Sequence, residues 1–215
     1  MVERKIYDCV YGKVKAHLES APKCHDFDHT LRVLNNARKL ASELPECELE
    51  VVELGALLHD IARPEEMAAQ GGLCHAEAGA GMVPDVLRAC GVEDEALILR
   101  VQRCVRRHRY RDAIHPESLE EKIVFDADKL DSIGAVGVGR AFHFAGREGA
   151  RLHNTEEEAL GSDAYSREDS AYREYLVKLR HVKDRMMTVP GRRIAESLTE
   201  VMDAFFDQLN REAGH

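Results

Sequence analysis

The stretch VVELGALLHDIA, residues 51–62, decides the fold of this chain. Apolar residues fill almost all of it, which predicts a buried helix. His59 and Asp60 then stand side by side near its end. Burying a carboxylate without a partner is costly, and a divalent cation would pair with both side chains. Taken alone, the dipeptide favours a structural role, with the histidine bonded to a backbone carbonyl and the aspartate at a helix end.

Helical spacing of apolar residues recurs along most of the chain, and no run alternates apolar and polar residues as a half-buried strand does. We therefore predict an all-α fold, a helical bundle that ends in a C-terminal helical hairpin. The expected helices span residues 3–19, 26–44, 48–62, 75–90, 93–109, 118–133, 137–146, 167–187 and 191–212. The polar stretch 146–166 is predicted to be irregular, either mobile or a lid near a site.

Length and composition favour one domain. The 215 residues suffice for one well-buried core. We expect the core at about residues 20–145 and a helical extension at about 165–212. Hydrophobic residues make up 44% and charged residues 32%, which argues against a disordered or fibrous chain. The formal net charge of −9 argues against stable nucleic-acid binding, but a few arginines could still hold a small anion.

The chain has no apolar stretch long enough for a membrane span, and its N-terminus lacks the apolar block of a signal peptide. We therefore expect a cytoplasmic protein without membrane contact. The cysteines contain no CxxC pair, so neither a zinc knuckle nor a redox motif is indicated. We predict that all six are reduced thiols: Cys9, Cys24, Cys47, Cys74, Cys90 and Cys104.

An earlier segment adds groups that could accompany His59 and Asp60. In HDFDHTLRVLNNA, residues 25–37, the side chains of His25, His29 and Arg32 share one face of the expected helix. That face could present a metal ligand and a phosphate-binding cation together. His25 and Asp26, considered alone, favour a helix cap.

A later segment, DADKLDSIG at residues 126–134, supplies Asp126, Asp128 and Asp131. Alone, these acids favour a solvated helix face. Asp128 and Asp131, however, lie on one side of a helix that also carries buried-type apolar residues. Together with the two earlier segments, they favour a site.

The chain carries one ordered set of candidate ligands: His29, His59, Asp60 and Asp128. With its surrounding segments, this set resembles the HD-domain metal-dependent phosphohydrolase superfamily, in particular its stand-alone bacterial and archaeal hydrolases. The segment KLRHVKDRMMTVPGRRIA, residues 178–195, is similar to the tail of that subgroup. The resemblance implies a bundle of at least five helices in which these four residues hold one divalent cation. Such a mixed nitrogen and oxygen set suits Mn²⁺, Fe²⁺, Co²⁺, Ni²⁺ or Zn²⁺ better than Mg²⁺.

The resemblance also implies that metal-activated water attacks phosphorus. Arg32 and Lys129 are the candidates for binding the phosphate, and Asp131 or His75 for orienting the water or passing a proton, beside the catalytic Asp60. For His75 and His108 three roles stay open: ligands of a second metal, contact with the substrate phosphate or proton transfer, and a structural role.

The subgroup implies a nucleotide as substrate, including cleavage of triphosphates to monophosphate and pyrophosphate. The substrate, the bond cleaved and the oligomeric state are not specified by the residues. Hydrolysis of the alarmone ppGpp is not favoured, because Arg63 and Pro64 replace the Glu-Asp pair that follows the HD helix in those hydrolases. Two alternatives remain: a non-catalytic nucleotide-binding regulatory module, and a di-iron oxygenase with additional histidine ligands.

Overall fold

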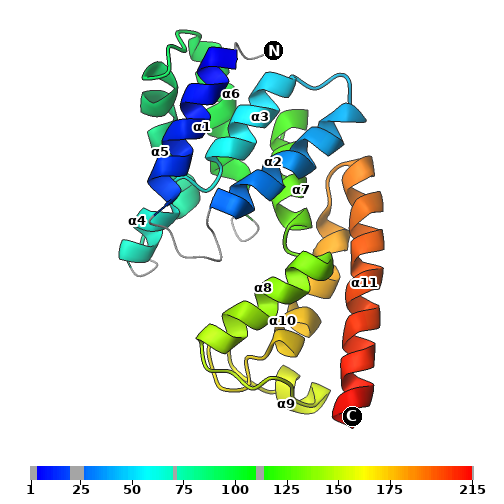
Figure 1. Cartoon of the computed structure of the whole chain (residues 1–215). Coiled ribbons are helices and arrows are strands. Elements are labelled where there is room, and N and C mark those ends of the chain that lie inside the picture. Colours follow the sequence, from blue (N-terminus) through cyan, green and yellow to red (C-terminus); the bar gives the residue numbers. More distant parts are fainter. Residues whose placement is uncertain (1–3, 20–26, 70–71, 110–113, 215) are drawn as a thin grey trace. The chain divides into compact units, whose positions relative to one another are not determined.

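A computed structural model describes residues 4–19, 27–69, 72–109 and 114–214. Every regular element within these ranges is a helix, which confirms the predicted all-α fold (Figure 1). None of these helices is both long enough and apolar enough to cross a membrane. The chain divides into two compact units, residues 1–128 and 129–215, and the expected single domain stays a prediction. His25 and Asp26 lie outside the described residues.

The first unit is built around one central helix. Its helices are α1 (Arg4–Leu18), α2 (Phe27–Ser42), α3 (Leu49–Leu58), α4 (Arg63–Ala68), α5 (His75–Arg88), α6 (Glu95–Arg107) and most of α7 (Leu119–Leu130). Helices α1, α2 and α6 pack on α3, and α5 packs on α6. The central position of α3 follows from its sequence, because apolar side chains cover most of its surface, interrupted only by Glu50 and Glu53, and neighbouring helices must cover that apolar surface.

Close packing around α3 depends on Gly55. A Cβ atom at this position would lie 2.9 Å from Cβ of Cys104 on α6 and 3.2 Å from Cγ2 of Val124 on α7. Helix α3 ends at Leu58, and the chain then turns through residues 59–62 instead of continuing the helix to residue 62 as predicted. Helix α4 begins immediately afterwards with Pro64 in its first turn, where the missing N–H of a proline costs no hydrogen bond.

The second unit contains α8 (Gly134–Arg147), α9 (Glu156–Leu160), α10 (Ala171–Val177), the 3₁₀ helix η1 (Leu179–Arg185) and α11 (Val189–Ala213). Helix α11 packs on α8 and η1, while α10 packs on α8, α9 and η1. Aromatic rings form part of this core: the centroids of Tyr175 and Phe206 lie 4.4 Å apart in a stacked arrangement. The two shorter helices followed by α11 correspond to the predicted C-terminal hairpin.

Two segments of the second unit differ from the predicted elements. The stretch 146–166, predicted to be irregular, contains α9, which starts with a capping box between Thr155 and Glu158. The predicted helix 167–187 begins only at Ala171 and is divided into α10 and η1 at Lys178, whose backbone leaves the helical region at φ −141°. Buried Asn154, just before α9, binds the start of α10: its Oδ1 accepts a hydrogen bond of 2.6 Å from Oγ of Ser170, the N-cap of α10.

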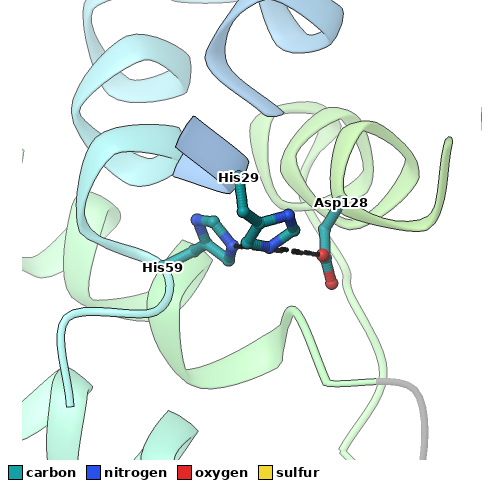
Figure 2. A group of neighbouring side chains, drawn as sticks. All are labelled: His29, His59 and Asp128. Carbon is teal, nitrogen blue, oxygen red and sulfur yellow. Dashed lines mark hydrogen bonds and ion pairs between the residues drawn. The ribbon is translucent and has the colours of Figure 1, made fainter. Parts of the chain in front are cut away.

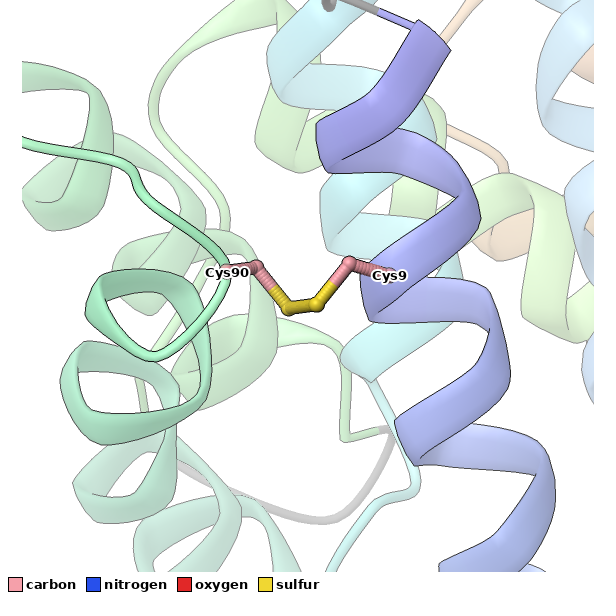
Figure 3. Close-up of a disulfide and its surroundings, with 2 residues drawn as sticks. All are labelled: Cys9 and Cys90. Carbon is pink, nitrogen blue, oxygen red and sulfur yellow. A yellow bond between two sulfur atoms is a disulfide. The ribbon is translucent and has the colours of Figure 1, made fainter.

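A disulfide joins Cys9 on α1 to Cys90, just after α5, with the Cα atoms 5.7 Å apart (Figure 3). The prediction of reduced thiols was therefore wrong for this pair. The two cysteines are 81 residues apart in sequence, and the packing of α1 beside α5 brings them together. Cys47, Cys74 and Cys104 carry no disulfide, and Cys24 lies outside the described residues.

Candidate metal centre

Three elements of the first unit bring His29, His59 and Asp128 together (Figure 2). His29 is in the first turn of α2, His59 follows the last residue of α3, and Asp128 is near the end of α7. Nε2 of His29 lies 3.2 Å from Nε2 of His59 and 3.5 Å from Oδ1 of Asp128. Both imidazoles are buried, and the Asp128 side chain is 15% exposed. These nitrogen and oxygen atoms therefore face one another in a nearly enclosed space.

Asp60 completes this first group. Its Oδ2 lies 3.5 Å from Nε2 of His29 and 3.7 Å from Nε2 of His59. The structure thus places all four predicted ligands around one position, and metal binding by them stays a prediction.

The other oxygen of Asp60 faces a second pair of histidines. Oδ1 lies 3.3 Å from Nε2 of His75, at the start of α5, and 3.4 Å from Nε2 of His108, just after α6. The two Nε2 atoms are 3.2 Å apart, and all three side chains are buried. Asp60 therefore stands between two groups, each of which could hold an ion.

Backbone carbonyls set the orientation of two of the imidazoles. Nδ1 of His59 lies 2.8 Å from the carbonyl oxygen of Ala56, and Nδ1 of His108 lies 2.6 Å from that of Val105. A carbonyl oxygen only accepts, so in each ring Nδ1 carries the proton and donates it. The lone pair of His59 Nε2 then faces His29 and the carboxylates of the first group, and that of His108 Nε2 faces Oδ1 of Asp60. Both rings are in a tautomer that leaves Nε2 able to bind a metal.

Burial keeps two of the imidazoles neutral. It lowers the pKa of His59 to about 3 and that of His75 to about 4, although the nearby Asp60 carboxylate opposes both shifts. At neutral pH both rings are therefore in the uncharged form that binds a metal.

The donor set fits a divalent cation. Nε2 of His59 presents a lone pair because Nδ1 of the same ring donates to the carbonyl of Ala56, and it lies 3.2 Å from Nε2 of His29, so one cation could bind both nitrogens. Ligand atoms at about 2.0–2.2 Å from a shared ion are expected to be roughly 3–3.5 Å apart. Within the second group all three separations span 3.2–3.4 Å. Within the first group the contacts of His29 span 3.2–3.5 Å, whereas Nε2 of His59 lies 3.7 Å from Asp60 Oδ2 and 3.9 Å from Asp128 Oδ1. The second group therefore has the spacing expected around one ion, and the first group has the same donor chemistry with wider separations at His59.

Two charged residues of α4, Arg63 and Glu66, adjoin this centre and were missed as site residues. Nε of Arg63 lies 2.9 Å from Oδ2 of Asp60, and its Nη1 donates to Oε2 of Glu66 at 2.7 Å. Glu66 Oε1 lies 2.9 Å from Nδ1 of His75. Burial raises the pKa of Glu66, but its contacts with His75 and Arg63 outweigh burial and leave that pKa below its ordinary value. The sequence offered one sign of their role: Arg63 follows Asp60 by three residues and Glu66 follows Arg63 by three, a spacing that places side chains on one side of a helix.

The remaining predicted residues lie as follows. Arg32 is partly buried on α2, three residues after His29. Lys129 is partly buried and Asp131 is buried, both in the second unit. Oδ2 of Asp131 accepts a hydrogen bond of 2.7 Å from Nη1 of Arg140. Their roles in binding phosphate and orienting water stay predictions.

The chain is similar to known proteins over its whole length. The model of the HD domain family matches residues 26–133. The uncharacterized protein YpgQ of Bacillus subtilis (strain 168) is 33% identical over 219 residues, which cover 99% of this chain and 96% of YpgQ. The crystal structure of YpgQ in complex with ADP superposes with a TM-score of 0.73 and 29% identity, covering 99% of this chain and 97% of the other. An HD-superfamily hydrolase from Bacillus thuringiensis superposes with a TM-score of 0.74 and 27% identity, covering 97% and 96%.

Proposed function

This chain belongs to the HD domain family, and from that premise we propose that it is a metal-dependent phosphohydrolase acting on a nucleotide or a related small phosphate ester or anhydride. The observation that carries the proposal is the convergence of the His29, His59, Asp60 and Asp128 side chains from three parts of the first unit. Structural neighbours that are HD-superfamily hydrolases support a hydrolytic reaction.

His29, His59, Asp60 and Asp128 would hold the first divalent cation. When bound, the cation supplies a Lewis acid that makes water a better nucleophile near neutral pH and polarises a phosphoryl oxygen. The mixture of imidazole and carboxylate ligands favours Mn²⁺, Fe²⁺, Co²⁺, Ni²⁺ or Zn²⁺ over Mg²⁺.

Asp60, His75 and His108 would hold a second divalent cation. Nε2 of His75 and Nε2 of His108 both face Oδ1 of Asp60. This arrangement favours metal binding by the two histidines over direct contact with the substrate phosphate. Arg32 and Lys129 would then neutralise phosphate charge, and Asp131 would orient the attacking water from a carboxylate that Arg140 holds in place.

A nucleotide is the favoured substrate class, since the Bacillus subtilis relative forms a complex with ADP. The test is a product analysis after incubation of the metal-loaded protein with nucleoside mono-, di- and triphosphates. We expect turnover that a chelator abolishes and Mn²⁺ restores, with either phosphate or pyrophosphate as a product.

Two outcomes would favour the alternatives. Tight nucleotide binding without turnover of any compound, by protein carrying its full metal content, would assign the chain to the non-catalytic regulatory modules. Oxygen consumption by protein reconstituted anaerobically with iron, together with a di-iron Mössbauer spectrum, would assign it to the oxygenases.

A further inference from the structure

Four side chains form a closed ring of polar contacts at one edge of the candidate centre. Nε of Arg63 lies 2.9 Å from Oδ2 of Asp60, whose Oδ1 lies 3.3 Å from Nε2 of His75. Nδ1 of the same imidazole lies 2.9 Å from Oε1 of Glu66, and Oε2 of Glu66 accepts from Nη1 of Arg63 at 2.7 Å. The exposed fractions of these side chains are 1% for Asp60, 3% for His75, 16% for Glu66 and 21% for Arg63. Each contact uses a different atom, so the ring fixes all four groups at once.

The position of His75 in its helix explains why this ring is needed. His59 and His108 each follow the last residue of a helix, and there the carbonyl three residues earlier accepts from Nδ1. His75 is instead the first residue of α5. A helix presents N–H groups at this end and no carbonyl that could accept from an imidazole. The acceptor for His75 must therefore come from another element, and α4 supplies it as Glu66.

We propose that Glu66 and Arg63 are positioning residues that hold His75 in the tautomer with its proton on Nδ1. Both carboxylates that face His75 only accept, but Oε1 of Glu66 lies 2.9 Å from Nδ1 whereas Oδ1 of Asp60 lies 3.3 Å from Nε2, so the shorter contact favours the proton on Nδ1. The opposite tautomer would place a proton on Nε2 and direct it at Oδ1 of Asp60, 3.3 Å away. That proton would occupy the space between His75 and Asp60 where a second cation would bind. Glu66 thus selects against the form of His75 that would close this site to a metal.

Arg63 holds the acceptor in place. It lies three residues before Glu66, so both side chains project from one side of the short helix α4. Its guanidinium contacts one oxygen of Glu66 and one of Asp60, which leaves the other oxygen of each carboxylate facing His75. The inference rests on the proposed function only in treating His75 as a ligand, since the tautomer itself is a property of the metal-free protein.

Histidine ring ¹⁵N NMR of the metal-free protein at pH 7.5 measures the tautomer, with His75→Gln assigning the resonances. In the parent we expect a protonated Nδ1 and an unprotonated Nε2 on His75. In Glu66→Ala the proton should move to Nε2, and the affinity of the second site for Mn²⁺ should fall about 10- to 100-fold while the first site keeps its metal. Glu66→Gln is the second variant, for the case that Glu66→Ala does not fold. Glutamine preserves the shape of the side chain and keeps only one acceptor oxygen, so we expect it to shift the His75 tautomer partially.

The matched control is Glu65→Gln. Glu65 is the neighbouring residue on α4, but its Oε1 contacts Nε2 of His17 on α1 at 3.0 Å. This change should alter neither the His75 tautomer nor the metal content. A parent protein with the His75 proton on Nε2, or a Glu66→Gln variant with the parent's tautomer, would overturn the inference. If the tautomer behaves as expected but no nucleotide is hydrolysed, the positioning role stands and the proposed function fails.

Discussion

Asp60 presents one carboxylate oxygen to each of two histidine pairs. We therefore expect Asp60→Ala to reduce the metal content of both groups and to lower kcat for nucleotide hydrolysis by about 100-fold or more. Elemental analysis and a turnover assay measure the two effects. The control is Asp28→Ala, which removes an exposed carboxylate next to His29 and should change neither. Full metal content in the Asp60 variant would contradict the assigned ligand set.

The buried imidazoles of His59 and His75 predict how the stability of the metal-free protein depends on pH. Burial lowers their pKa values to about 3 and about 4 in the folded state, against about 6.5 in an unfolded chain. Between these values the unfolded chain binds protons that the folded chain does not. The contribution of the two neutral imidazoles to the free energy of unfolding is therefore fully present above about pH 6.5. It falls as the pH drops toward 4, by up to about 1.4 kcal/mol per pH unit for each histidine.

Urea denaturation of chelator-treated protein at pH 7.5, 6.0 and 5.0 measures this dependence. His75→Gln removes one of the two groups and should flatten the slope by up to half. A free energy of unfolding that does not change between pH 6.5 and 5 would contradict neutral, buried imidazoles.

The ligand candidates could be selected from sequence because their order and surrounding segments resemble a known family. The ring around His75 could not be selected in this way. It depends on the direction in which Arg63 and Glu66 project from a six-residue helix, and a sequence of charged residues there is equally compatible with a solvated surface. The same holds for Asp60, since nothing in a dipeptide shows that its two oxygens face different histidine pairs.

At the scale of the helices, Gly55 allows α6 and α7 to approach α3 closely. A methyl group at this position would lie 2.9 Å from Cβ of Cys104, an atom that cannot move without its backbone. We expect Gly55→Ala to lower the free energy of unfolding by about 1–3 kcal/mol, which thermal or urea denaturation measures.

Gly81→Ala is the control for this change. Gly81 is exposed within α5, and apart from its chain neighbours and the adjoining backbone of this helix, no atom of the described residues lies within 4 Å of the position that its Cβ would occupy. Alanine there should stabilise the protein by about 0.5–1 kcal/mol through helix propensity alone. Equal effects of the two substitutions would show that Gly55 does not govern the packing of α3.

Periodicity located the long helices and missed the short ones for a physical reason. A helix is visible in sequence through its buried stripe, and α4 has no buried residue at all, whereas α9 has only Ala159. The division of the predicted helix 167–187 arises at Lys178, a residue with good helix propensity, so the local sequence gave no sign of it.

At the scale of the whole molecule, the disulfide between Cys9 and Cys90 closes a long loop of the first unit. Such a crosslink stabilises a fold mainly by restricting the unfolded chain. We expect the double substitution Cys9→Ser and Cys90→Ser to lower the free energy of unfolding by about 2–5 kcal/mol. Cys47→Ser, at a cysteine without a disulfide, should have a much smaller effect.

A thiol count on the denatured, non-reduced protein checks the bond directly. Were both Cys9 and Cys90 to react with a thiol reagent, the crosslink would be absent. The pairing could not be predicted because it depends on the tertiary contact between α1 and α5, and the spacing of the cysteines carries no trace of that contact.

The position of the disulfide also sets an order of events during synthesis of the chain. Both cysteines have been translated once residue 90 is added, whereas His108 and Asp128, which complete the two groups around Asp60, are added later. A nascent chain can therefore form the disulfide, whose loop contains His29, His59, Asp60 and His75, before either candidate metal group is complete. In an oxidising environment, the entropy of bringing α1 to α5 would already be lost when the last ligands leave the ribosome. In a reducing environment, the same helices would have to be held by packing alone until Asp128 arrives.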